Sequence, residues 1–296
     1  MKNRIFQYSG YILFGALLFL LFIYIKFPYL KLKDKLTNSF ENRFLYALTI
    51  KDVRPLFPLG LTLKEIEIFT DPKEKKITIL NAQKIDLKLE IIAIFIGNRN
   101  IFYEINAYNG IIRGAVKNLE SKKDKKTSIN ADIQNIDLTR YSLLNRDVNL
   151  SLSGKLRGKV NIFARENTTP GFSGNITLFV DNGKIEGINI KRVRLKEISL
   201  KGVDCDFELT QQEVFLKKMA FHGEDIDVVM TGKILLAEQI KESNLDLMLH
   251  FKPKQGFMRK YSFLFTLFRN IRGKGGFYSI PLKGTIQRPE FETLRI

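Results

Sequence analysis

The sequence predicts a mainly β protein: a long, twisted antiparallel sheet with one N-terminal transmembrane helix and few short helices. Three observations support this prediction. An uncharged apolar run lies near the N-terminus, hydrophobicity then alternates with a period of two, and turn residues recur at short intervals. The chain has 296 residues, enough to bury one or two cores, and its 45% hydrophobic content is ordinary for a folded protein.

The N-terminal apolar run covers residues 5–25 and is flanked by basic residues. Because about 20 apolar residues cross the hydrocarbon core of a bilayer, we predict a cytoplasmic N-terminus at 1–8 and a transmembrane anchor at 9–27. The run is longer than the apolar region of a signal peptide and no small-residue cleavage site follows it, which favours an uncleaved anchor. The predicted anchor residues are Tyr11, Leu17, Leu21 and Tyr24, and tyrosine suits the membrane interface.

The orientation of this anchor is not decided by local charge. Lysines after the run outnumber the basic residues before it, which by the positive-inside rule would keep the large domain in the cytoplasm. Long domains can nevertheless be translocated despite flanking charge.

The rest of the chain can be divided into segments by the spacing at which its apolar residues recur. Residues 28–52 place apolar residues three or four apart, including Leu36, Phe40 and Leu48, which predicts a helical lead-in. In residues 53–117 the period changes to two, with strict alternation at 85–90, which predicts a first β segment. The charged stretch 118–127 predicts a basic loop, and residues 128–296 predict a second β segment, with about a dozen or more strands in all.

The second β segment ends in a strand that carries two prolines. Residues 277–291 predict a closing strand at the edge of the sheet, because Pro281 and Pro289 cannot donate to a sheet ladder. Three glycines, Gly154, Gly232 and Gly284, each follow an apolar strand and are followed by another aliphatic residue, which predicts bends or bulges.

The apolar face of such a sheet must be covered. A sandwich or barrel would cover it with the protein's own residues, whereas an open groove would be occupied or shielded by something else. The same apolar strand positions would line a closed core or an open groove: Leu87, Leu89, Leu150, Leu152, Leu178, Val180, Leu247 and Leu249.

An amphipathic helix is predicted at 257–271 within the second β segment. Phe257, Tyr261, Phe265 and Phe268 recur at helical spacing among basic residues. The favoured interpretation is a helix that caps the apolar face of the sheet. Contact with membrane headgroups and binding of a partner protein are the alternatives.

The net charge is +17, from 48 Lys and Arg against 31 Asp and Glu, which favours partners with negative surfaces. The basic residues are scattered over many strands, and no nucleic-acid module is visible, so we predict no nucleic-acid partner. Anionic lipid headgroups or an acidic protein explain the charge more simply.

The sequence contains no recognisable catalytic or metal-binding motif. Cys205 is the single cysteine, which excludes an internal disulfide, and its alternating neighbours predict a buried, inert thiol. His222 and His250 form no metal-binding pair. The acidic cluster at 224–227 fits a solvated turn better than a weak cation site. We therefore predict no enzymatic activity, no metal and no cofactor, with bound phospholipid as the one ligand to consider.

Three segments resemble a known family: "FPLGLTLKEIEI" at 57–68, residues 129–162, and "GGFYSIPLKGTIQRPEF" at 275–291. Together with the anchor they resemble the type II secretion system protein N family of the AsmA-like superfamily. The closing strand matches the pattern of that superfamily through Pro281, Leu282, Gly284, Ile286 and Pro289. The resemblance covers nearly the whole chain.

This resemblance implies a single-pass protein of the bacterial inner membrane whose C-terminal domain lies in the periplasm. It implies a non-catalytic accessory of the type II protein secretion system, with membrane lipids and other secretion components as partners. AsmA-like relatives form groove-shaped sheets associated with lipid transport, so the alternative function is lipid binding or transfer, with phospholipid acyl chains held in an apolar groove.

Overall fold

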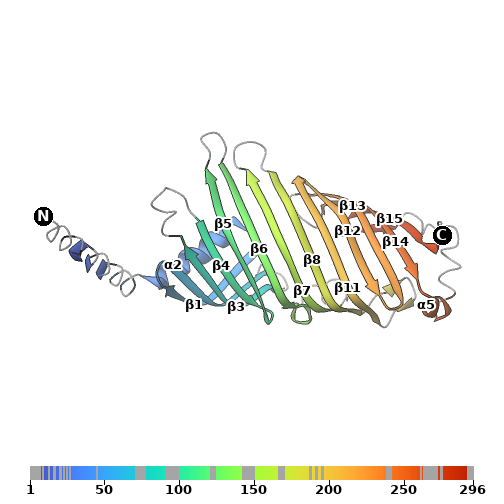
Figure 1. Cartoon of the computed structure of the whole chain (residues 1–296), viewed down its shortest axis with the longest axis horizontal. Coiled ribbons are helices and arrows are strands. Elements are labelled where there is room, and N and C mark those ends of the chain that lie inside the picture. The colour runs from blue at the N-terminus through green and yellow to red at the C-terminus, as the bar shows by residue number, and fades with distance from the viewer. Residues whose placement is uncertain are drawn as a thin grey trace.

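The computed structural model consists mainly of one open antiparallel sheet of 14 strands (Figure 1). It describes residues 28–44, 46–70, 78–90, 100–120, 125–141, 151–165, 171–186, 189–190, 193–194, 197–237, 242–260 and 276–291, with isolated positions at 8–26, 262 and 273. Strands that are consecutive in the sequence pair with each other, except that β8 pairs with β11 across a separate two-stranded ribbon. The predicted mainly β, antiparallel architecture is confirmed.

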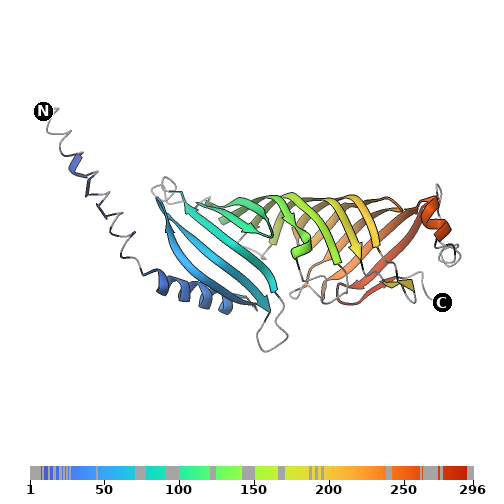
Figure 2. The same cartoon turned by 90° about the horizontal axis from the view of Figure 1, so that it is seen from below.

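The first half of the sheet contains six strands: β1 (Tyr46–Leu56), β2 (Gly60–Thr70), β3 (Thr78–Leu89), β4 (Asn100–Ala107), β5 (Gly110–Glu120) and β6 (Lys125–Asp137). The second half contains β7 (Ser151–Arg165), β8 (Gly171–Glu186), β11 (Glu197–Gln211), β12 (Glu213–Gly223), β13 (Ile226–Leu235), β14 (Asn244–Pro253), β15 (Tyr278–Thr285) and β16 (Pro289–Phe291). The ribbon is formed by β9 (Asn189–Ile190) and β10 (Val193–Arg194). The strands twist progressively along the sheet (Figure 2).

The helical lead-in is shorter than predicted. Helix α2 covers Tyr29–Arg43, and β1 begins at Tyr46, so the lead-in does not reach residue 52. Leu48 belongs to the strand because its backbone pairs with Ile68 of β2. The sequence pattern was ambiguous here, since residues four apart share one face in a helix and in a strand alike.

The predicted membrane anchor lies largely outside the described residues. Within the part of the chain that the structure describes, no helix is long and apolar enough to cross a membrane. Tyr11 and Tyr24 are described and are exposed in helical conformation, whereas Leu17 and Leu21 lie outside the described residues.

The predicted basic loop at 118–127 is mostly strand. β5 continues to Glu120 and β6 begins at Lys125, and the register of the two strands extends over both ends. Charged residues are compatible with this strand pair because alternate positions of a strand face solvent. The two predicted β segments therefore form one continuous sheet.

The predicted closing strand is two strands. β15 and β16 are separated by residues 286–288, and they pair only from Leu282 to Gly284 of β15. Pro281 lies just beyond this pairing, and Pro289 lies in the edge strand, as the missing N–H of proline requires.

Two glycine positions of the predicted repeat have the backbone conformation that glycine favours. Gly154 has φ 132° and lies at a register irregularity between Ser153 and Lys155. Gly232 has φ 136° within β13. The predicted bulge is confirmed at Gly154, whereas at Gly232 the register irregularity lies in the partner strand β12, between Leu216 and Met219.

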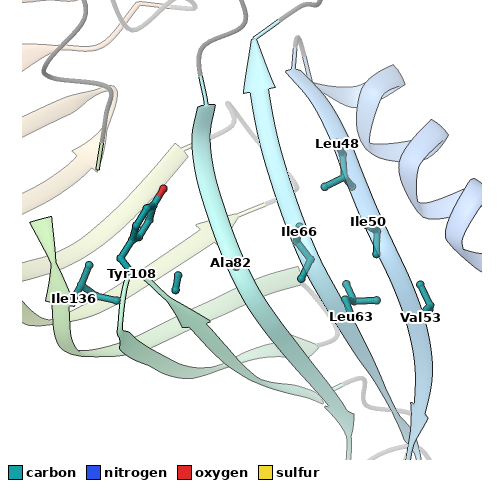
Figure 3. Packing of buried hydrophobic residues seen from close by; sticks show 9 residues of the cluster. Leu48, Ile50, Val53, Leu63, Ile66, Ala82, Tyr108 and Ile136 are labelled. Carbon is teal, nitrogen blue, oxygen red and sulfur yellow. The ribbon is translucent and has the colours of Figure 1, made fainter. Parts of the chain in front are cut away.

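A buried cluster occupies the N-terminal end of the sheet. Its buried members include Leu48, Ile50, Val53 and Ile66, from β1 and β2, and their side chains lie on the same face of the strands (Figure 3). Leu36 and Phe40 of α2 pack against this cluster, and Figure 2 shows α2 beside β1. A second cluster contains Val180, Leu200, Val203 and Cys205, from β8 and β11.

Only the beginning of the predicted amphipathic helix is described. Helix α5 covers Gln255–Lys260, and its Phe257 is buried. Tyr261, Phe265 and Phe268 lie outside the described residues.

Candidate functional site

One face of the sheet is apolar across its whole length. We call it the inner face, because it carries both buried clusters. The antiparallel register places inner-face residues of neighbouring strands opposite one another, so that they form rows across the sheet. Row B, for example, contains one residue from every strand between β1 and β15: Val53, Leu63, Ile85, Ile105, Ile112, Ile133, Gly158, Leu178, Cys205, Met219, Met230, Leu249 and Ile280.

Three further rows flank row B. Row A runs from Leu156 on β7 to Tyr278 on β15. Row C runs from Leu61 on β2 to Leu282 on β15, and row D from Leu89 on β3 to Leu245 on β14. Every residue of rows A, C and D between these first and last members is uncharged, and so is every residue of row B. Between β7 and β14, where all four rows are present, the inner face is therefore a continuous apolar surface about 20 Å wide, since six residues of strand separate row A from row D.

The burial of these rows is uneven. In row A, Val180, Val203, Phe251 and Tyr278 are buried. In row D, the described side chains are half-buried, and Leu89 is 42% exposed. Row C also contains two buried side chains, Leu216 and Leu247, whereas no residue of row D is buried.

Helices cover only a part of this face in the described structure. The helix with extensive contact to a strand is α2, which packs on β1, while the short helix η1 (Leu138–Arg140) contacts β7. Leu138 packs against the second buried cluster, on the row A side. The half-buried residues of row D have no such cover among the described helices.

The opposite, outer face is charged. Ion pairs connect neighbouring strands across it, with N···O distances of 2.7 Å for Arg113–Glu104, 2.8 Å for Arg157–Asp181 and 2.8 Å for Lys217–Glu208. These side chains are substantially exposed, so each pair contributes little to stability. Their main consequence is that water is the natural environment of the outer face.

One buried polar group interrupts this pattern near the N-terminal end of the outer face. The Thr62 hydroxyl donates to the Asp86 carboxylate at 2.7 Å, and Lys84 Nζ lies 2.6 Å from the other carboxylate oxygen. Burial is the largest influence on the pKa of Asp86 and raises it, but the hydrogen bonds from Lys84 and Thr62 and the charges of Lys84 and Lys88 outweigh it. The pKa of Asp86 is held below its usual value.

The sequence-predicted groove residues fall on the inner face wherever they are described. Leu87 and Leu247 lie in row C, Leu89 in row D, Leu178 and Leu249 in row B, and Val180 in row A, while Leu152 pairs with Ile185, which packs against the second cluster. Leu150 lies outside the described residues.

Other residues of the same face were missed at the sequence level. Met219 and Met230 lie opposite each other in row B, and Ile162 belongs to row D. The alternation of apolar and polar residues around them is visible in the sequence, but in β12 the extra residue Lys217 reverses which positions face inward. Only the paired register shows that Leu216 and Met219 face the same side.

The titratable residues do not assemble a reaction centre among the described residues. His222 contacts Asp204 at 3.1 Å and His250 contacts Ser279 at 2.8 Å, both on the outer face. Cys205 is buried as predicted, and this burial, with a smaller effect of Asp204, raises the pKa of its thiol to about 11. Within the described ranges, no group of three His, Cys, Asp or Glu residues could hold a metal ion.

The acidic cluster predicted at 224–227 lies at the turn between β12 and β13. Glu224 and Asp225 are exposed, and Asp227 lies 3.4 Å from Lys254 Nζ. This arrangement agrees with the interpretation as a solvated turn.

The β1 edge of the sheet is covered against further pairing, and the opposite edge is blocked where β16 pairs with Leu282–Gly284 of β15. At β1, the backbone N–H of Leu48 donates to the Glu41 carboxylate of α2, and Lys33 of α2 donates to the backbone carbonyl of Lys51, each at 3.3 Å. At the other edge, β16 is only three residues long and contains Pro289. Helix cover, short length and proline are the usual means of blunting an edge strand.

No family model, curated protein or solved structure matches this chain. The fold and its two surfaces define this chain as a mainly β protein with an open antiparallel sheet that is apolar on one face and charged on the other.

Proposed function

We propose that this protein binds lipids by holding their acyl chains against the inner face of the sheet. One observation carries the proposal: uncharged rows of apolar side chains cross the sheet, and those of row D are half-buried rather than sealed in a core. A large accessible apolar surface on a folded protein usually marks a binding surface.

The chemistry of the inner face matches hydrocarbon. Its backbone N–H and C=O groups are directed to neighbouring strands, and its rows offer aliphatic, aromatic and sulfur-containing side chains. A ligand with polar groups would lose hydrogen bonds to water there without replacement. Each methylene transferred from water contributes about 0.8 kcal/mol, so about ten methylenes contribute roughly 8 kcal/mol before the costs of association.

The length of the surface is sufficient for lipids. The 14 strands of the sheet have 13 spacings, which at about 4.8 Å each give a length of about 62 Å. The acyl region of one bilayer leaflet is about 15 Å deep, half of the hydrocarbon thickness. The inner face is thus several acyl chains long.

The source of the lipid in this proposal is the membrane that the predicted anchor would occupy. The apolar run at 5–25 would hold α2, and with it the N-terminal end of the sheet, near a bilayer. The inner-membrane location, the periplasmic domain and the non-catalytic accessory role in type II secretion rest on the sequence resemblance, and they stay predictions.

The proposal is tested by native mass spectrometry combined with lipid extraction. A shortened chain that begins at Tyr29 retains the described elements from α2 onward and lacks the apolar run. Purified from bacterial cells without detergent, it should carry phospholipid at stoichiometric amounts. A lipid-free mass together with a cooperative thermal melt would refute the proposal.

Two neighbouring residues of β13 provide a matched pair of variants. Ile234 faces inward in row D, and Leu235 faces outward and is 45% exposed. Ile234→Asp should remove the bound lipid, because it places a charge on the apolar surface. Leu235→Asp, one position along the same strand, should leave the lipid bound and the melting temperature nearly unchanged.

A further inference from the structure

The strands end on one side in a rim that exposes large apolar side chains. We call it the row D rim and define it by six exposed residues at or next to row D: Phe57, Leu89, Phe102, Phe163, Phe172 and Leu235. The first lies in the β1–β2 turn, and the others lie in β3, β4, β7, β8 and β13. The carbonyl of Leu59 accepts a hydrogen bond from the N–H of Leu89 at 2.9 Å, which places this turn beside row D.

Both faces of the sheet contribute to the row D rim. Leu89 lies in row D itself, and Phe172 lies two residues beyond row D in β8, so both belong to the inner face. Phe102, Phe163 and Leu235 each directly follow a row D residue and therefore lie on the outer face. Acyl chains held on the inner face do not contact these three side chains. The proposed function alone therefore does not explain why they are exposed.

The opposite ends of the strands differ from this rim. There, the described large apolar side chains with comparable exposure lie only beside the terminal strands, with Phe44 and Tyr46 at β1 and Met258 and Phe277 at β15. From β2 to β14, the described residues at that end include none. Single exposed apolar residues are common on soluble proteins, whereas a series along one edge marks a contact surface.

Lysines accompany the aromatic residues of the rim. Lys88 is exposed and lies opposite Phe102 in the register of β3 and β4. Lys117 Nζ lies 5.9 Å from the centre of the Phe102 ring. Aromatic rings and lysines are enriched together where proteins meet the surface of a bilayer, because the ring lies among the headgroups and the ammonium group is attracted to anionic lipid.

Helix α2 is oriented so that its first residue is directed towards the same rim. Glu41 of α2 accepts from the N–H of Leu48, and Lys33 donates to the carbonyl of Lys51, so α2 runs opposite to β1. Tyr29, at the start of α2, is therefore directed towards the end of β1 that joins the β1–β2 turn. The predicted anchor precedes α2 in the sequence, so it would hold a bilayer on the side of the rim.

We infer that the row D rim lies on the surface of a bilayer that contains anionic lipids, with Phe102 and Phe163 among the headgroups. A fluid bilayer surrounds both faces of a thin edge without a fixed shape, whereas a folded partner would need a slot that fits both faces. The purpose of this contact rests on the proposed function. It brings row D, which has no buried residue, next to the acyl chains of the membrane.

Tryptophan fluorescence of the full chain tests this contact. The sequence contains no tryptophan, so one substitution introduces a single reporter. Phe102→Trp and Phe163→Trp report on the rim, and Tyr46→Trp, 42% exposed at the opposite end of the strands, is the matched control. Each variant is reconstituted in vesicles of phosphatidylcholine and phosphatidylglycerol with brominated acyl chains, because bromine quenches tryptophan on contact. We expect both rim reporters to lose fluorescence relative to unbrominated vesicles and the control to retain it.

A second pair of variants tests the role of lipid charge. One basic residue near an anionic surface favours contact about fivefold, so in the Phe163→Trp chain Lys117→Gln should lower the ratio of docked to undocked rims by that factor. Lys155→Gln, an exposed lysine at the opposite end of β7, should leave the quenching unchanged. Omission of phosphatidylglycerol should weaken the quenching as well. Circular dichroism melts show whether each variant retains the fold.

A reporter on the inner face separates this inference from the proposed function. Phe207→Trp lies in row C and reports lipid held on the inner face. Quenching of Phe207→Trp while the rim reporters stay unquenched would overturn the rim contact and leave lipid binding in place. Quenching of the rim reporters without Phe207→Trp would support the rim contact and contradict the proposed function. Equal quenching of Tyr46→Trp, or quenching of the rim that does not depend on phosphatidylglycerol, would contradict the inference.

Discussion

Removing the same side chain from two positions of the sheet should have different effects on stability. Ile66 is 2% exposed in the N-terminal cluster, whereas Ile176 is half-buried in row C of β8. We predict that Ile66→Ala lowers the free energy of unfolding about twice as much as Ile176→Ala does.

The magnitudes follow from burial. Isoleucine to alanine removes three carbon atoms, which at about 0.8 kcal/mol each amount to roughly 2.4 kcal/mol when the site is fully buried. The cavity left behind raises the cost at Ile66 to about 3–4 kcal/mol. At Ile176 the side chain is partly covered, so most of the transfer term still applies, but water can enter the space and no cavity term is added; we therefore expect about 1.5–2 kcal/mol.

The measurement is urea denaturation of the chain that begins at Tyr29, after removal of lipid. The sequence has no tryptophan, so far-UV circular dichroism is the appropriate signal. An equal denaturant slope in both variants would show that the unfolding reactions are comparable. A loss at Ile176 as large as the loss at Ile66 would mean that the inner face is a sealed core, and it would refute the reasoning that leads to lipid binding.

Three further predictions concern single residues. Gly232→Ala should destabilise the protein by on the order of 2 kcal/mol, because an alanine at φ 136° is strained and its Cβ would collide with the backbone of β14, whereas Gly202→Ala, with 3.6 Å to its nearest neighbour, should be almost neutral in the same melt. The pKa of Asp86 is lowered in the folded state, so its carboxylate stabilises the fold at pH values above its pKa in the unfolded chain, and this stabilisation is lost as the pH falls through the folded-state pKa. Asp86→Asn should therefore weaken the dependence of the melting temperature on acid pH. An unchanged acid profile of the melting temperature would contradict this prediction. Cys205, with a pKa of about 11, should react with a thiol reagent at neutral pH only after urea is added, and fast labelling of the folded protein would show that the row B interior is open to solvent.

The blunted edges limit how the apolar surface can be extended. Because Glu41 and Lys33 occupy backbone groups of β1, another strand cannot pair there unless α2 moves. The three-residue β16 offers little length for pairing at the opposite edge.

The sequence by itself determined the class of the fold. The alternation of apolar and polar residues predicts strands with one apolar face, and this follows from the local geometry of a strand, in which successive side chains point to opposite sides. Pro281, Pro289 and Gly154 were interpreted correctly for the same reason, since the demands of proline and glycine on the backbone are local. The inward position of Leu87, Leu178 and Leu247 also followed from alternation alone.

Only the tertiary structure decided which residues lie together and how far they are covered. Leu48 could belong to a helix or to a strand until its pairing with β2 was known, and the charged ends of β5 and β6 could be a loop until their register was known. The continuity of Met219 and Met230 with Cys205 depends on the bulge at Lys217. Register and burial arise from contacts between residues distant in sequence, and a pattern along one strand does not contain them.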